Sequence, residues 1–465
     1  MVKHMSPMLL RAWLDITAGW HAAFRQHRSF RRALCQALGT LVALGRRTLS
    51  RALWAEGRQL LDWSADYRLH ARAAWQPQDL FQPILDKARP FCRGRYACVA
   101  VDDTRLHKTG RRILTASYQR DPLSPKFRIN LMFGLRFLQM SLLTPLYRIG
   151  KQPARALPVR FEEVPAVKKP RRKAPQQEWA VWRQQSKLHN LSTHTVETLR
   201  GLRDSLDAAG YADKTLLAVC DNSFCNRTVF RAEFTRTSVI ARARRDVKLC
   251  HRATEGGPRF YGEVKFTPQQ VYDDPSIPWQ KTRIFHGGQW RKVRYKEVPD
   301  IYWQSGARQK PLRLFVVARI PYQVPGRERK SYGDPAFLLT TDLKGTPREL
   351  LQAYFDRWQI EVNHREEKDT LGVGQAQLRS AQSVPRQPAF VVAAYSALLL
   401  AGLLAYGPDR GAPYPALPKW RRNAKRPSCL DLITLLRKEM VENQALMVPL
   451  GLQLDWKTLG LAAVA

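Results

Sequence analysis

The chain has 465 residues, enough for about three domains of ordinary size. Its 77 lysine and arginine residues outnumber its 39 aspartate and glutamate residues, so the formal net charge is +38. Hydrophobic residues make up 44% of the chain, which excludes a basic protein that is disordered throughout. A positive excess of this size favours a polyanionic partner, nucleic acid first and an anionic membrane second, over a small metabolite alone.

The seven cysteines follow neither a disulfide framework nor the spacing of a structural zinc site. His251 beside Cys250 could suggest a metal site, but two residues do not complete a tetrahedral one. The first residues lack the charged and apolar segments of a secretory signal. We therefore expect a reducing compartment, the cytoplasm or the nucleoid.

Residues 8 to about 90 are predicted to form short helices, because leucine recurs there at helical spacing and Gly39 and Gly45 interrupt the pattern. This combination is compatible with a helix-turn-helix reader of DNA, and equally with a helical bundle that has a solvated basic face. The basic side chains that would form the face are Arg25, Arg28, Arg31, Arg32, Arg46, Arg47 and Arg51.

From residue 96 the pattern changes to strands. The apolar runs YACVAV (96–101) and TLLAVC (215–220) are typical of buried strands, and they end at Asp102 and Asp221. Because the ends of parallel strands meet at one edge of a sheet, these two carboxylates are expected to lie close together. Carboxylates gathered there would repel one another unless divalent cations lie between them.

Three longer segments complete the prediction for the middle of the chain. Residues 151–173 form a proline-rich basic loop, and residues 178–209 form a long helix. Residues 246–322 contain several short strands separated by turns. Three basic runs are candidates for contact with DNA phosphates: residues 168–173, 242–248 and 419–426.

A helix predicted for residues 346–371 carries the most informative residues. Thr346 and Glu349 have the spacing of a capping box, and Gly372 follows the last helical residue. Such a helix face can bind a metal ion and phosphates, or it can be a solvated face with ordinary ion pairs. The residues that share the face are Tyr354, Arg357, Glu361, Arg365 and Lys368.

Residues 389–406 are uncharged and nearly all apolar. Their length of 18 residues is at the short limit for a helix that spans a membrane. The alternative is a helix that is buried on all sides in a large core. We expect the buried helix and no membrane association, because only one such segment exists and charged segments flank it.

Together these residues resemble the bacterial insertion-sequence transposases of the DDE type. The spacing Tyr-x2-Arg-x3-Glu-x6-Lys, which ends at Lys368, is similar to the YREK signature of that family. VDDT (101–104) resembles the segment of the first catalytic carboxylate, and AVCDNS (218–223) resembles the second. The resemblance extends over about residues 95–405, with the segments in the family's order.

The resemblance implies an α/β fold, with an RNase H-like catalytic core, a β-rich insertion and an N-terminal all-helical domain. It places the insertion between the second and third carboxylates. The expected domains are a helical DNA-binding domain (1–92), the first part of the core (93–245), the insertion (246–325), the second part of the core (326–406) and a C-terminal helical region (407–465).

The resemblance also implies that Asp102, Asp221 and Glu361 hold two Mg²⁺ ions, which Mn²⁺ could replace. The same site would cut DNA at transposon ends and join the 3′-hydroxyl to target DNA by in-line displacement at phosphorus, in some relatives through a DNA hairpin. Asp103 is the alternative first carboxylate; Asp102 is preferred because the family tends to show Asp-x-Ser/Thr, which Thr104 completes.

DNA contacts are implied for Tyr354, Arg357, Arg365 and Lys368. Trp290 is the first candidate to receive a flipped base and Trp303 the second, although strand aromatics more often serve packing. His364 could bind a phosphate or could pack. The implied partner is double-stranded DNA, bound by a homodimer. Two other functions stay open: a DNA-binding regulator without catalysis, and a DNA nuclease without strand transfer.

Overall fold

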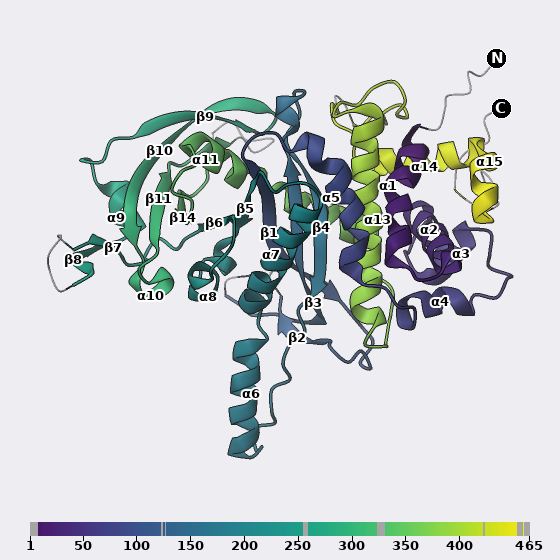
Figure 1. The fold of residues 1–465 in the computed structure, drawn as a ribbon, viewed down its shortest axis with the longest axis horizontal. Coiled ribbons are helices and arrows are strands. Elements are labelled where there is room, and N and C mark those ends of the chain that lie inside the picture. Colours follow the sequence, from purple (N-terminus) through teal and green to yellow (C-terminus); the bar gives the residue numbers. More distant parts are fainter. Residues whose placement is uncertain are drawn as a thin grey trace.

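A 12-stranded mixed sheet crosses the molecule, and most of the helices pack together at one end of it (Figure 1). The protein is therefore a mixed α/β protein. The first residues and the last few residues of the chain are not part of this description. The computed structural model describes residues 8–121, 124–125, 127–253, 259–322, 331–421, 424–452 and 459.

The N-terminal segment forms short helices, as predicted. Gly45 ends the second of them in a turn with φ of +67°, but Gly39 interrupts nothing. Its missing side chain instead lets two helices approach, since a Cβ there would lie 2.8 Å from the carbonyl oxygen of Ala52. The helices are α1 (Met8–Ala18), α2 (His27–Val42), α3 (Leu49–Ala55), α4 (Ser64–Ala71) and α5 (Gln82–Ala88).

Five neighbouring strands form the half of the sheet beside these helices. Their spatial order is β4-β3-β1-β5-β6. The pairs β4–β3 and β3–β1 are antiparallel, whereas β1–β5 and β5–β6 are parallel. The strands are β1 (Tyr96–His107), β3 (Leu131–Thr144), β4 (Arg155–Glu163), β5 (Thr215–Cys220) and β6 (Thr237–Arg242). The basic loop predicted for residues 151–173 is therefore wrong for residues 155–163, which form the mostly buried strand β4.

The predicted strand-rich stretch extends this sheet. Strand β14 lies between β6 and β11 and is antiparallel to both, so the later strands are hydrogen-bonded to the earlier ones. The two glycines at 287–288 form the predicted turn between β9 and β10. The added strands are β7 (Leu249–Arg252), β8 (Tyr261–Phe266), β9 (Gln280–His286), β10 (Gln289–Tyr302), β11 (Pro311–Val317) and β14 (Ala336–Thr340).

Short elements fill the connections. Strand β2 (Ser117–Arg120) pairs with the first residues of β3, and β12 (Pro321–Tyr322) pairs with β13 (Ser331–Tyr332) in a separate ribbon. The short helices are α8 (Arg227–Arg231), α9 (Pro268–Asp273), α10 (Gln304–Ala307) and α15 (Gln444–Met447).

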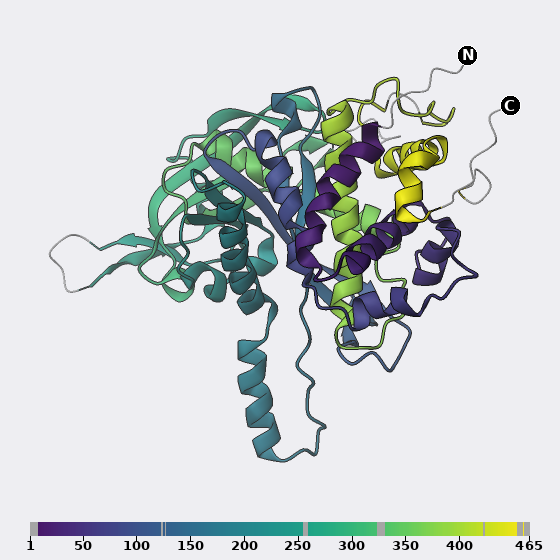
Figure 2. The ribbon, with the colours of Figure 1, turned by 45° about the vertical axis from the view of Figure 1, so that its right-hand side comes forward.

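The single helix predicted for residues 178–209 is wrong, because the chain forms two helices there. Helix α6 (Gln176–Leu188) ends before Asn190, and α7 (Leu191–Ala208) begins after it. The Asn190 side chain accepts hydrogen bonds from the backbone N–H groups of Ser192 and Thr193, which makes it an N-cap. Helix α6 projects from the body of the molecule (Figures 1 and 2).

The helix expected to carry Glu361 forms, but it is not continuous. It consists of α11 (Pro347–Asp356), α12 (Gln359–Arg365) and one π-helical turn (Glu366–Thr370). The predicted capping box of Thr346 and Glu349 is confirmed, and so is the stop at Gly372, whose φ is +59°. Turns of π-helix within a helix are frequent at functional sites.

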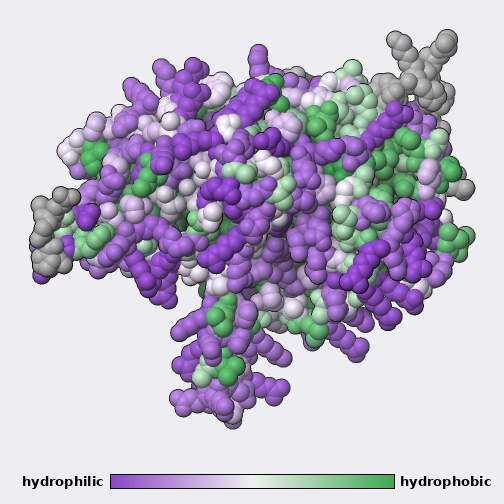
Figure 3. Space-filling model, in the orientation of Figure 1, coloured by the Kyte–Doolittle hydropathy of each residue, from purple (hydrophilic) through white to green (hydrophobic). Residues whose placement is uncertain are grey.

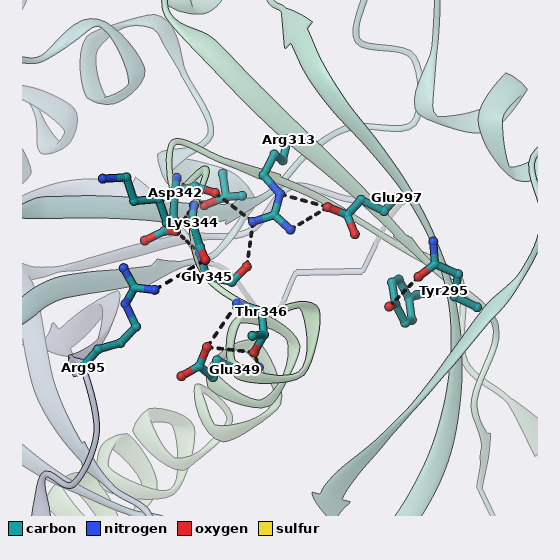
Figure 4. A network of polar contacts seen from close by, with 11 residues as sticks. Arg95, Tyr295, Glu297, Arg313, Asp342, Lys344, Gly345, Thr346 and Glu349 are labelled. Carbon is teal, nitrogen blue, oxygen red and sulfur yellow. Dashed lines mark hydrogen bonds and ion pairs between the residues drawn. The ribbon is translucent and has the colours of Figure 1, made fainter.

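A polar network fixes the start of α11 to the sheet (Figure 4). Arg313 on β11 donates from Nη1 to the carbonyl oxygen of Gly345 at 2.7 Å and from Nε to Glu297 Oε1 at 3.0 Å. The backbone N–H of Gly345 donates in turn to Asp342 Oδ1 at 2.6 Å. Thr346 follows directly, so the network sets where the helix begins and where Glu361 lies.

The apolar segment forms α13 (Ser383–Tyr406), which is mostly buried, in agreement with the expected core helix. It is the one helix among the described residues that is long and apolar enough to cross a membrane. It packs against β4, α1, α2 and α14 (Cys429–Glu442). The indole N–H of Trp13 on α1 donates to the carbonyl oxygen of Ala394.

Replacing Thr346 by alanine is expected to lower the free energy of unfolding by about 1 kcal/mol, because the first turn of α11 loses its side-chain cap. Urea unfolding monitored by circular dichroism measures this change. Thr346→Ser retains the hydroxyl acceptor and is expected to match the wild type. Equal stability of the alanine variant would contradict the role of the capping box.

Candidate functional site

Asp102 and Asp221 occupy neighbouring positions on adjacent parallel strands. Val101 of β1 is in register with Cys220 of β5, so the next residue of each strand emerges at the same edge. The charge of Asp221 contributes to raising the pKa of Asp102, so the two carboxylates lie within electrostatic reach. The register of β1 and β5 therefore brings the two strand ends together, as predicted.

Arg357 lies among the three candidate carboxylates, at the turn between α11 and α12. Its Nη1 is 3.8 Å from Asp102 Oδ2, and its Nη2 donates to Glu361 Oε1 at 3.3 Å. Burial alone would lower the pKa of Arg357, but the charges of Asp221, Asp102 and Glu361 raise it overall. One guanidinium thus faces all three acidic groups.

Two carboxylates of this site, Asp102 and Glu361, are held where ionisation is unfavourable. Burial raises the pKa of Asp102 to about 7, although Arg357 and the backbone N–H of Asp103 oppose the shift. Burial also raises the pKa of Glu361, and the charge of Asp221 adds to the effect. A group of acids in this state gains from a nearby cation, because the cation stabilises the ionised forms.

Asp103 faces a different set of groups from its neighbour Asp102. Its Oδ2 accepts from Arg136 Nε at 2.8 Å and lies 3.6 Å from Arg105 Nη1. Successive side chains of a strand point to opposite faces, which explains why the two aspartates separate. The geometry supports Asp102 as the residue that acts together with Asp221.

Two other residues of the predicted helix face lie at the same place. The hydroxyl of Tyr354 is within electrostatic reach of Asp221 and Glu361, and burial raises its pKa. Lys368, on the π-helical turn, is within reach of Asp102, and burial lowers its pKa. The face therefore brings a phenol and a second cation to the carboxylates.

Arg365 and His364 behave differently from the rest of this face. Arg365 is exposed, and its charge acts on Arg426 of the C-terminal segment; no contact found among the described residues joins it to the carboxylates. His364 is largely buried, which lowers its pKa to about 3, so its ring is neutral at physiological pH. In the described part of the chain, its Nε2 has no hydrogen-bond partner.

No ring contact or hydrogen bond found among the described residues joins either candidate tryptophan to the three carboxylates. Trp290 packs edge-on against Tyr147 and Phe285 and lies under Arg348, near the start of α11. Tyr147 in turn donates a hydrogen bond from its hydroxyl to Asp356 Oδ2 at 2.8 Å, and Asp356 directly precedes Arg357. Trp303 packs against Phe230 and is partly buried. Both rings have packing partners, in line with the packing alternative.

A cavity of about 450 Å³ opens beside Asp221. Its other lining residues were not predicted from the sequence to belong to the site. Tyr272 and Gln269 contribute to its wall. Only part of this lining could be predicted from the sequence. Residues 242–248 form one of the basic runs, and this run begins at the last residue of β6, the strand next to β5. The arginines that line the cavity are Arg242, Arg244, Arg245 and Arg319.

The donor chemistry of the three acids fits a hard divalent cation, which prefers carboxylate oxygens. Across the described ranges, however, no three carboxylate, imidazole or thiol groups form a ready arrangement for a metal ion. Asp102 and Glu361 bind Arg357 instead. The guanidinium thus supplies positive charge to both acids.

No protein-family model matches this sequence, and no curated protein matches it. The chemistry of the site must therefore be inferred from its residues. Three partly buried acids lie here beside Arg357, Lys368 and the arginines around the cavity, so the site combines both signs of charge.

Replacing Asp102 by asparagine is expected to stabilise the protein at pH 8, by about 1 kcal/mol or more. Below pH ~4 the group is protonated in both the folded and the unfolded chain, so the substitution changes little. As the pH rises toward the folded pKa of about 7, the unfolded chain loses the proton first, and the wild type loses stability that the variant keeps.

Urea unfolding from pH 4 to pH 8 measures this difference. Asp103→Asn is the matched control, because it breaks the ion pair with Arg136 and is expected to lower stability at pH 8. Equal effects of the two neighbouring substitutions would contradict the separate environments of Asp102 and Asp103.

Proposed function

We propose that the protein is a DNA transposase of the DDE type, which cuts the ends of a transposable element and joins the freed 3′-hydroxyl to target DNA. One observation carries the proposal: Asp102, Asp221 and Glu361 all face Arg357. They belong to three segments far apart in the sequence. Each segment resembles the corresponding segment of that family, and the closeness of the three acids to one guanidinium supports the proposal.

The strand arrangement supports an RNase H-like core. In such a core three antiparallel strands are followed by two parallel ones, and β4-β3-β1-β5-β6 has this order and these directions. The additional strands enter the chain between Asp221 and Glu361, as the family's insertion does. The proposal accounts for a stretch of 140 residues between two acids of one site.

In the proposed reaction, Asp102, Asp221 and Glu361 would hold Mg²⁺ or Mn²⁺, which when bound would stabilise the negative charge that develops at phosphorus. Arg357 and Lys368 would bind the oxygens of the phosphates next to the scissile bond. Tyr354 would donate a hydrogen bond to the same backbone.

The remaining parts of the proposal concern the partner. Double-stranded DNA would bind over the carboxylates, with the arginines of the cavity beside Asp221 on its backbone. The protein would act as a homodimer that holds two element ends in the cytoplasm, next to the nucleoid. These assignments follow from the resemblance and from the net charge of +38.

Glu361→Gln is expected to abolish cutting of duplex DNA that carries the element's own ends, because the site loses one ligand charge. DNA binding in a gel-shift assay is expected to survive. The assay uses the purified protein with Mg²⁺ or with EDTA, and products are resolved on denaturing gels. Strand-transfer products in the same reaction separate a transposase from a nuclease.

Glu349→Gln is the matched control, since it makes the same chemical change on the same helix and glutamine can still complete a capping box. It is expected to cut like the wild type. Tight binding to the ends without any cutting by the wild type would sink the proposed activity and favour a DNA-binding regulator.

A further inference from the structure

One part of the molecule extends away from the sheet and takes no part in the site. The chain leaves the sheet after β4, runs out through residues 165–175 and returns as α6, and we name residues 165–189 the arm. No residue of α6 is buried. Its 13 residues give the arm a reach of roughly 20 Å. Figures 1 and 2 show it as a projection from two directions.

The arm is held together by contacts of its own. The indole N–H of Trp182 donates to the carbonyl oxygen of Val167 at 3.3 Å. The ammonium group of Lys169 lies over the rings of Trp179 and Trp182, at 5.5 Å and 5.9 Å from their centroids. These contacts join the outgoing segment to the returning helix, so the arm has a defined shape without packing on the body.

The surface of the arm is strongly positive. It carries seven cations and a single acid, Glu178. None of the ion pairs found in the described part of the chain engages any of the seven. Figure 3 shows a largely hydrophilic surface over this projection. The cations are Lys168, Lys169, Arg171, Arg172, Lys173, Arg183 and Lys187.

A cavity of about 770 Å³ lies at the base of the arm. Arg111 and Arg112 line it from one side, and Lys168 and Lys169 line it from the arm. Leu114, Tyr118 and Phe133 contribute to its lining, and the two aromatic rings pack 5.2 Å apart. Cations on two walls with apolar and aromatic groups between them match the phosphates and sugars of a nucleic acid strand.

The arm and this cavity lie in line with the proposed active site. Strand β1 continues from Asp102 to His107, roughly 17 Å at strand spacing. His107 pairs with Gly134, and Gly134 pairs with Ser117 of β2, so the cavity lies at this end of the sheet. Strand β4 ends on the same side of Asp102, level with Thr104, because Glu163 and Thr104 both pair with Phe137. The arm begins two residues later.

We propose that the arm and the cavity at its base bind the backbone of duplex DNA beside the point of cleavage. The proposal rests on the proposed function for its placement. A duplex that lies over Asp102 and follows β1 reaches the cavity after about 5 base pairs and the tip of the arm after about one helical turn. The contacts are to phosphates, so they add affinity for any sequence and position the DNA.

The test measures how affinity depends on duplex length. Two full-length variants are compared with the wild type: one replaces residues 168–187 by a short Gly-Ser linker, and the other changes five cations to glutamine. The linker variant is not expected to disturb the packing of the core, because no residue of α6 is buried. Binding is measured by fluorescence anisotropy, without Mg²⁺, on a short duplex that ends before the arm and on a duplex about 15 base pairs longer. The five cations are Lys168, Lys169, Arg171, Arg172 and Lys173.

The wild type is expected to bind the longer duplex at least ~10-fold more tightly, and both variants are expected to lose that difference. The dependence of log affinity on log salt is expected to decrease by about 0.9 for each phosphate contact that is lost. A matched control changes five exposed cations at the other end of the sheet to glutamine and is expected to keep the length dependence. These are Lys265, Lys281, Arg283, Lys292 and Arg294.

Length dependence that survives removal of the arm would overturn the inference, even if the wild type binds and cuts DNA. Loss of dimers in light scattering, with unchanged DNA affinity, would also overturn it and would assign the arm to a second copy of the chain. A wild type that binds no DNA of either length would overturn the proposed function as well.

Discussion

The parallel pairing of β1 with β5 is the constraint on which the rest of the site depends. A shift of one residue in this register would move Asp102 away from Asp221 and turn its side chain to the other face of the sheet. The third acid arrives from far along the chain, on a helix whose start is fixed by Arg313 and the loop before Thr346. The geometry of the site is therefore a property of the sheet and of the point where one helix is anchored to it.

This geometry is maintained against an electrostatic cost. Three acids share one partly buried region, and a single guanidinium, Arg357, is the group that faces all of them. Burial raises the pKa of both Asp102 and Glu361, which means that the ionised site works against folding at neutral pH. Arg357 offsets part of this cost, because its charge lowers the pKa of Asp102 and of Glu361.

Local sequence signals predicted several features, although the local N-cap at Asn190, which divides α6 from α7, was missed. The capping box at Thr346, the stop at Gly372 and the two apolar strands that end in aspartate could all be read from neighbouring residues. The insertion of β14 between β6 and β11 could not, because strand order depends on contacts about 100 residues apart. The role of Gly39 could not be predicted either. It does not interrupt α2, and its missing side chain instead makes room for α3 to pack there. The arginines beside Asp221 were visible as a basic run, but their position around a cavity follows from the neighbouring strand.

The position of α13 has a consequence for the synthesis of the chain. Helix α1 buries its apolar face against α13 and binds Glu439 on α14 through its backbone N–H groups, contacts that span about 380 to 430 residues. A ribosome needs roughly 20 to 80 s to add that many residues, so the first helix emerges long before its packing partners exist. The N-terminal helices therefore complete their core only after α13 and α14 have been synthesised. A chain that ends before α13 would lack these packing partners, and the apolar face of α1 would stay uncovered by them.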